Sequence, residues 1–154
     1  MQFLIGCLYA IATMAPLQEK RSVWLKKVLN DRKVGATAYF AQKGKETTRT
    51  QLTYLGSFHE KGKTYFVISE FRRLKAAIVW HGRNRFIFLA QDGGILAEYD
   101  APVLESGLGS IRNGFLKFKY DNGEKMIKDS FRLAGFFPHF LRTESGMSLE
   151  KVSP

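Results

Sequence analysis

Apolar and polar side chains alternate with a period of two along most of the chain from residue 36 onward. Such alternation is typical of β-strands that bury one face, because successive side chains point to opposite sides of a sheet. Between residues 64 and 71, for example, Tyr65 and Val67 alternate with Phe66 and Ile68. The pattern predicts strands over eight segments, residues 36–41, 49–58, 64–71, 77–80, 86–90, 95–99, 114–120 and 126–131.

Turn-forming residues separate these segments. Asp-Gly and Asn-Gly pairs are strong hairpin signals, since both central residues of a type I′ turn need a positive φ. The expected turns are Lys43-Gly44-Lys45, Lys61-Gly62-Lys63, Gly82-Arg83-Asn84, Asp92-Gly93-Gly94 and Asp121-Asn122-Gly123. Short turns between consecutive strands predict a mainly β fold, an antiparallel meander of about eight strands. Such a meander forms either a closed or strongly curled, barrel-like sheet or a two-layer sandwich.

The segment 22–33 has helical spacing instead. Trp24, Leu25, Val28 and Leu29 fall on one arc at about 100° per residue. This apolar stripe predicts an N-terminal helix packed against the sheet. Because lysines occupy the remaining surface, a basic amphipathic helix lying on an anionic surface is the alternative.

The segment 1–18 is uncharged and contains an apolar run. An export signal needs a positive charge before its apolar run, and none precedes this one. A membrane-spanning helix needs about 20 apolar residues, whereas the stretch from residue 3 to residue 17 is shorter and contains Pro16. Positive charges follow the segment, which favours a cytosolic domain. We therefore expect a retained segment, docked on the domain or membrane-associated, with a cleaved export signal as the alternative. A cytosolic or membrane-associated location is accordingly favoured over an exported one.

The length of 154 residues favours one domain. We expect the apolar segment 1–18, a single mainly β domain over residues 19–142 that includes the helix 22–33, and a polar, frayed tail over residues 143–154. The single cysteine, Cys7, excludes an internal disulfide framework.

Positive charge is the most distinctive feature of the composition. The chain has 24 Lys and Arg residues against 14 Asp and Glu, which gives a net charge of +10. Residues 19–49 hold nine of the basic residues and three of the acidic ones. This excess favours an anionic partner, either a membrane surface or an acidic protein, and it also fits a nucleic acid.

Motifs for catalysis are weak in comparison. The three histidines, His59, His81 and His139, lack the close spacing of a metal-binding pair, so we expect no metal. The glycine-rich stretch 106–114 has Arg112 where a dinucleotide fingerprint needs its third glycine. We find no catalytic constellation and expect no cofactor and no enzymatic activity.

Basic residues interleaved with aromatic ones are the strongest functional signal. In the segment 115–120, Lys117 and Lys119 share a strand face with Phe115. Trp80-His81-Gly82-Arg83-Asn84-Arg85 is expected to form a basic aromatic hairpin. The candidate partner-binding residues are Lys20, Arg21, Lys26, Lys27, Arg72, Arg73, Arg83, Arg85, Arg112, Lys117 and Lys119.

These residues predict a non-catalytic binding or scaffold domain that presents a basic face to a membrane surface or an acidic protein. The alternative is a β domain that binds single-stranded nucleic acid, with cations for phosphates and rings for bases. A third possibility is a carrier that holds an apolar ligand inside a β-barrel.

Overall fold

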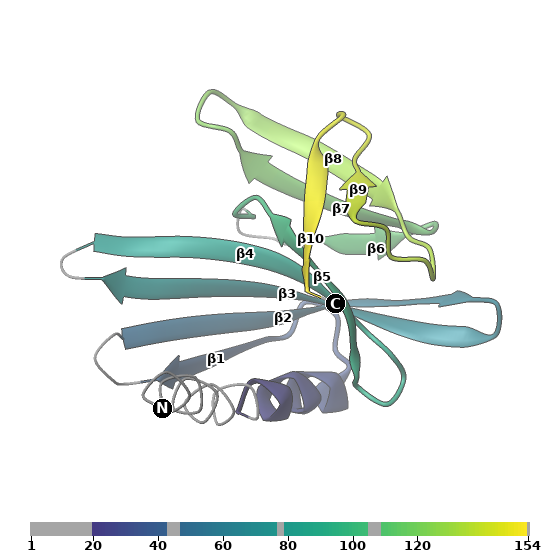
Figure 1. Cartoon of the computed structure of the whole chain (residues 1–154), viewed down its shortest axis with the longest axis horizontal. Helices are drawn as coiled ribbons and strands as arrows, with labels where there is room; N and C mark the ends of the chain where they lie inside the picture. The colour runs from purple at the N-terminus through teal and green to yellow at the C-terminus, as the bar shows by residue number, and fades with distance from the viewer. Residues whose placement is uncertain (1–19, 43–46, 77–78, 105–108, 154) are drawn as a thin grey trace, which may run out of the picture.

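The computed structural model describes residues 20–42, 47–76, 79–104 and 109–153. Within these residues the fold is mainly β, with ten antiparallel strands in two sheets and a helix over residues 20–31 (Figure 1). The strands are β1 (Thr37–Gln42), β2 (Thr47–Glu60), β3 (Lys63–Ala76), β4 (Val79–Leu89), β5 (Ile95–Ala101), β6 (Ser110–Arg112), β7 (Phe115–Asp121), β8 (Met126–Arg132), β9 (Phe140–Arg142) and β10 (Ser148–Ser153). The segment 1–18, with Cys7, and the turn 43–45 lie outside the described residues.

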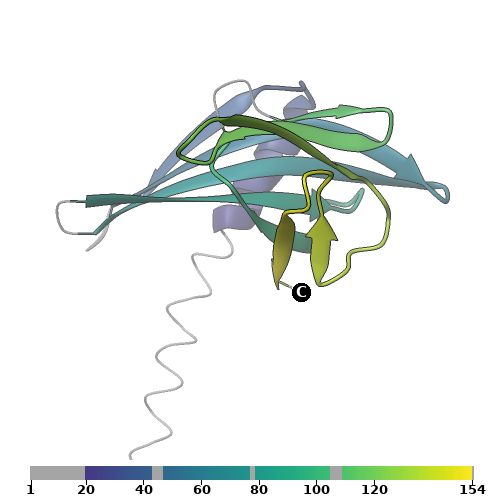
Figure 2. The same ribbon diagram turned by 90° about the horizontal axis from the view of Figure 1, so that it is seen from above.

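The first five strands form the expected meander, in which each strand pairs with the next. After β5 the chain forms the three-stranded sheet β6-β7-β8 and then returns to the first sheet as β9 and β10. β10 pairs with β5, so the seven-stranded sheet has the order β1-β2-β3-β4-β5-β10-β9. The molecule therefore has three layers, with the helix on one face of the seven-stranded sheet and the three-stranded sheet on the other (Figures 1 and 2).

Aromatic side chains fill the space between the two sheets. Phe86 and Phe88 of β4 meet Phe118 and Phe131 of the three-stranded sheet, with ring centroids 5.3 to 6.4 Å apart. Tyr99 of β5 is fully buried beside Phe88, and burial raises its pKa to about 12. Two sheets stacked over a packed core make this a sandwich, which is one of the two expected architectures.

The helix packs on the opposite face of the seven-stranded sheet, as its apolar stripe predicted. Leu25 and Val28 are buried in a second core that includes Ile68 of β3. Trp24 stacks on Phe40 of β1, with ring centroids 4.7 Å apart. Burying each large apolar side chain stabilises the fold by roughly 1.5–3 kcal/mol, so this contact holds the helix against the sheet.

The expected turns at Lys61-Gly62-Lys63, Asp92-Gly93-Gly94 and Asp121-Asn122-Gly123 are confirmed, with a positive φ at Gly62, Gly93 and Gly123. The expected turn and basic aromatic hairpin around Gly82-Arg83-Asn84 are wrong. These residues lie inside β4, where Arg83 pairs with Arg72, so residues 79–80 and the expected strand 86–90 belong to one strand. Residues 77–78 of the expected strand 77–80 lie outside the described residues. Gly82 serves close packing instead, because a Cβ there would lie 2.9 Å from the Phe71 ring.

The expectation of a frayed tail over residues 143–154 is also wrong. Residues 148–153 form β10, which lies between β5 and β9. Leu149 is buried in the core between the sheets, and Lys151 pairs with Tyr99. Backbone pairing and the burial of one leucine thus order a segment whose side chains are mostly polar.

Candidate functional site

The basic residues that the sequence analysis selected lie on all three layers. Lys20, Arg21, Lys26 and Lys27 are on the helix, Arg72, Arg73, Arg83 and Arg85 are on the seven-stranded sheet, and Arg112, Lys117 and Lys119 are on the three-stranded sheet. They therefore do not form one surface. The helix and the three-stranded sheet lie on opposite sides of the seven-stranded sheet.

The outer surface of the three-stranded sheet brings together cations from all three of its strands. Along β7, Leu116 and Phe118 are buried in the core while Lys117 and Lys119 are exposed. Residues directly opposite each other in an antiparallel pair point to the same face. The register therefore places five basic residues on the outer surface, which we call the basic sheet face: Arg112, Lys117, Lys119, Lys128 and Arg132.

Three rows of side chains cross this face. Phe115 lies directly opposite Arg112 on one side and Arg132 on the other. In the next row, Lys117 lies opposite Ser110 and Ser130. In the third row, Lys119 faces Lys128. Because alternate residues on a strand are about 6.8 Å apart, the rows form a regular array of positive charge.

A hollow of about 480 Å³ lies over the second and third rows. It is lined by Ser110, Lys117, Phe118, Lys119, Lys128, Asp129, Ser130 and Glu144. Ser130 Oγ donates a hydrogen bond of 2.6 Å to Glu144 Oε2, and the Glu144 backbone N–H donates to the Ser130 carbonyl at 2.8 Å. These two bonds hold Glu144 at the rim.

Asp129 fixes the turn that carries Glu144. Its carboxylate accepts hydrogen bonds from the backbone N–H groups of Ser130 and Ser145, at 2.8 and 3.0 Å, and from the Ser145 hydroxyl. Burial would raise the pKa of Asp129, but these bonds and one from Thr143 hold it below its ordinary value. An ionised Asp129 therefore anchors the β9–β10 turn to the edge of β8.

Carboxylates of the protein neutralise little of the positive charge on the basic sheet face, although Glu144 lies at the rim of the hollow. Among the described residues, no ion pair joins any of its five cations to a carboxylate. The directly opposed lysines Lys119 and Lys128 repel each other, which costs stability. A bound anion would remove this repulsion, so the arrangement is suited to an anionic partner.

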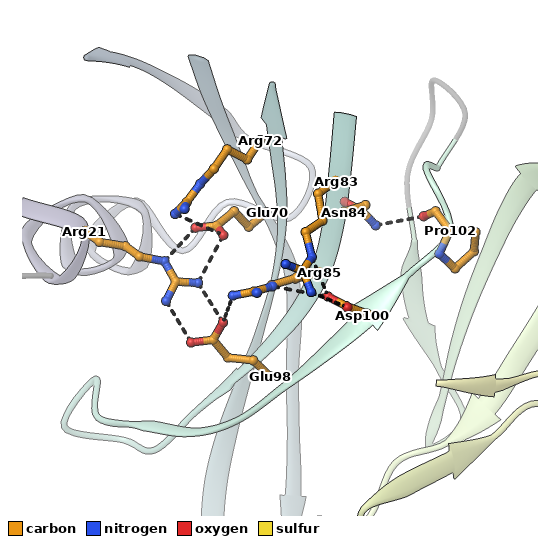
Figure 3. Close-up of polar contacts among 9 residues, drawn as sticks. All are labelled: Arg21, Glu70, Arg72, Arg83, Asn84, Arg85, Glu98, Asp100 and Pro102. Carbon is orange, nitrogen blue, oxygen red and sulfur yellow. Dashed lines mark hydrogen bonds and ion pairs between the residues drawn. The ribbon is translucent and has the colours of Figure 1, made fainter. Parts of the chain in front are cut away.

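Other basic residues are neutralised within the protein, as Figure 3 shows for Arg21. Arg21 Nε donates to Glu70 at 2.8 Å, and its two Nη atoms donate to Glu98 at 2.7 and 2.9 Å. Arg85 Nη1 donates to the same Glu98 carboxylate at 2.9 Å. The Glu70 and Glu98 side chains are only 2% and 4% exposed. This network ties the helix to β3, β4 and β5.

Electrostatics in this network favour the ionised forms. Burial would lower the pKa of Arg21, but hydrogen bonds and charge from Glu98 and Glu70 raise it above its ordinary value. Burial would raise the pKa of Glu98, but the hydrogen bonds and charge of Arg21, with the charge of Arg85, lower it. These groups act as internal ion pairs that hold the helix on the sheet.

The remaining predicted residues divide between the two faces of the seven-stranded sheet. Arg83 pairs with Asp100 on the helix side, and Arg72 lies 3.5 Å from Glu70. Arg73 is on the other face, with its guanidinium 5.3 Å from the centroid of the Phe71 ring.

Sequence reasoning missed two cations of the basic sheet face, Lys128 and Arg132. Both lie on β8 at positions that alternate with the buried Phe131. Pairing β7 with β8 through the Asp121-Asn122-Gly123 turn places them opposite Lys119 and Phe115. The hairpin signal was therefore sufficient to find them.

Two other features are absent from the described residues. No group of three or more His, Cys, Asp or Glu side chains there is arranged to hold a metal ion. No helix in the same residues has the length and apolarity needed to cross a membrane. Comparison of the chain with protein-family models, with curated proteins and with solved structures finds no match.

Proposed function

We propose that this protein is a binding domain that presents the basic sheet face to an anionic partner, a membrane surface or an acidic protein. The observation that carries the proposal is the directly opposed pair Lys119 and Lys128, which lies among three further cations. In the described part of the chain, none of the five forms an ion pair with a carboxylate. The fold tolerates this repulsion at a cost. Binding to an extended anionic surface compensates that cost, since each basic residue near an anionic membrane contributes about 1 kcal/mol of binding free energy.

The position of the helix limits how such a surface is engaged. Lys20, Lys26 and Lys27 are exposed on the helix, on the far side of the seven-stranded sheet from the basic sheet face. A flat membrane that contacts one of these surfaces does not contact the other. The proposal therefore assigns binding to the basic sheet face and treats the helix lysines as a separate surface.

The test compares charge reversal on the two surfaces. Lys117→Glu/Lys119→Glu should weaken binding to phosphatidylserine-containing vesicles, or to polyglutamate, by about 30-fold or more, since two cations near the surface contribute about 2 kcal/mol. Lys26→Glu/Lys27→Glu makes the same charge change on the helix. Lys33→Glu/Lys61→Glu makes it at two exposed loop positions that belong neither to the helix nor to the basic sheet face.

Vesicle sedimentation at several salt concentrations measures the binding. The proposal expects a large loss only for the sheet variant, together with weakening at high salt as the charges are screened. Equal binding by the sheet variant and the wild type would contradict it. A loss confined to the helix variant would move the site to the helix.

A further inference from the structure

A second surface on the seven-stranded sheet combines an exposed ring, Tyr39, and a half-buried ring, Phe71, with arginines. It is a groove of about 340 Å³ lined by Tyr39, Phe40, Ala41, Arg49, Thr50, Gln51, Phe71 and Arg73. The groove lies toward the end of β1, β2 and β3 that is remote from the β2–β3 turn. It is on the same side of the sheet as the three-stranded sheet, because Phe71 alternates in phase with Val67 of the core between the sheets.

One row of side chains across the groove carries the rings. Tyr39 of β1 lies opposite Gln51 of β2, and Gln51 lies opposite Phe71 of β3. Tyr39 is 75% exposed. Neighbouring strands are about 4.8 Å apart, so the two aromatic residues start from backbones about 9.6 Å apart, with an amide side chain between them.

The Phe71 ring lies over β4 in the space beside Gly82, which has no side chain. A Cβ on Gly82 would lie 2.9 Å from Phe71 Cε2 and 3.1 Å from Cζ. Contacts closer than 3.0 Å are not tolerated without movement, so the ring occupies the space that any other residue at position 82 would need. The Arg73 guanidinium, 5.3 Å from the ring centroid, is within the range of a cation–π contact.

The next row supplies positive charge. Arg49 lies directly opposite Arg73, and both side chains are exposed. The groove thus has rings and an amide in one row and two guanidinium groups in the next. A nucleic acid has the matching components, since every base has a flat π-face and every linkage carries a negative charge.

We infer that this groove binds single-stranded nucleic acid, with unpaired bases stacked on Tyr39 and Phe71 and the phosphates beside Arg73 and Arg49. Because the two rings project from strands whose backbones lie about 9.6 Å apart, they fit two splayed bases of one strand better than the single base of a free nucleotide. The Gln51 amide has a donor and an acceptor for the edge of a base. The inference concerns a surface separate from the basic sheet face and does not depend on the proposed function.

The experiment measures binding of the full chain to a fluorescent, mixed-sequence single-stranded oligonucleotide by anisotropy. Removing one stacking ring weakens such binding by about 5- to 150-fold, and we expect this for Tyr39→Ala and Phe71→Leu. Gly82→Ala should weaken binding without any change of charge, because the new methyl group displaces the Phe71 ring. Phe136→Ala removes an aromatic side chain that is 73% exposed outside the groove, and it should bind as the wild type does.

Three controls make the result decisive. Thermal unfolding of each variant shows whether it is folded. If Phe71→Leu does not fold, Tyr39→Ala still tests the inference, because the Tyr39 side chain is largely exposed and its loss should not disturb the fold. An abasic oligonucleotide of equal length keeps the phosphates but offers no bases. AMP and inorganic phosphate serve as competitors that represent a free nucleotide and a free anion.

The inference expects weaker binding of the abasic oligonucleotide and poor competition by AMP and phosphate. It is overturned if Tyr39→Ala and Phe71→Leu bind the normal oligonucleotide as well as the wild type does. Equal affinity for the abasic oligonucleotide, or AMP competing as well as the oligonucleotide, also overturns it. If only Lys117→Glu/Lys119→Glu reduces oligonucleotide binding, the groove is excluded and the basic sheet face is the site.

Discussion

Arg21 on the helix and Glu98 on β5 are 77 positions apart in the chain and form a bidentate ion pair, with Nη1 and Nη2 each donating to one carboxylate oxygen. The same guanidinium also binds Glu70 on β3. A planar fork with five donors makes this possible, and a lysine does not reproduce it. Arg21 is therefore a structural residue, although the sequence grouped it with the exposed lysines around it.

Replacing Arg21 separates the structural from the surface role of the helix charges. Arg21→Ala leaves the Glu70 and Glu98 side chains buried without their main partner, which should cost about 3–5 kcal/mol of unfolding free energy. Urea unfolding measures the loss. The control Lys20→Glu/Lys26→Glu/Lys27→Glu changes only exposed side chains and should stay within about 1 kcal/mol of the wild type. A stable Arg21→Ala variant would show that the ion pairs contribute little.

The lowered pKa of Glu98 makes stability depend on pH. Its ordinary value is 4.5, so the ionised group stabilises the folded state above that pH, and the contribution is lost as the pH falls through the lower folded-state pKa. Glu98→Gln should therefore be less stable than the wild type at neutral pH. The difference should shrink as the pH falls below about 5. Urea midpoints measured across this range test the sign, and a difference that grows with acid would contradict it.

Asp129 should determine the order of the β9–β10 turn. Asp129→Ala removes the acceptor for the backbone N–H groups of Ser130 and Ser145, which should cost about 1–3 kcal/mol. Amide hydrogen exchange should become faster over residues 143–147 and stay slow in β3 and β4. Glu150→Ala, at a side chain 62% exposed, is the matched control. Unchanged protection of the turn would mean that its backbone hydrogen bonds suffice without Asp129.

Stability and binding should change in opposite directions at Lys128. Lys128→Glu places a carboxylate directly opposite Lys119, and exchanging repulsion for attraction should stabilise the fold by about 0.2–1 kcal/mol. The same change should weaken binding to anionic vesicles. Lys125→Glu alters the charge equally in the adjacent turn, outside the pairs of β7 with β8, and should leave stability nearly unchanged. A destabilised Lys128→Glu variant would refute the proposed repulsion.

The β-meander was predictable because its signals are local. Period-two alternation and Asp-Gly or Asn-Gly turns act within one hairpin, and they located β1–β3, β5, β7 and β8. The break placed at Gly82 was wrong because a glycine that leaves room for the distant ring of Phe71 has the same local signature as a turn glycine. β10 was missed because its order depends on pairing with β5, about 50 residues earlier.

The candidate site was only partly predictable for a similar reason. Alternation along one strand placed Lys117 and Lys119 with Phe115, and the pairing of strands added Lys128 and Arg132. The sequence did not show that Arg21 and Arg85 are held by carboxylates from other strands. One signal was present, since Glu70 shares its strand face with Phe66 and Ile68, where a buried carboxylate needs a cationic partner.

The pairing of β5 with β10 also has a consequence for synthesis on the ribosome. The chain is synthesised from its N-terminus, so β1–β5 leave the ribosome before β10, the strand that covers the outer edge of β5. Until residue 153 has emerged, the nascent meander exposes the backbone of β5 along that edge. Exposed strand edges pair readily with other chains. Nascent chains of this protein should therefore be most prone to aggregation, and most in need of a chaperone, in the interval between the synthesis of β5 and that of β10.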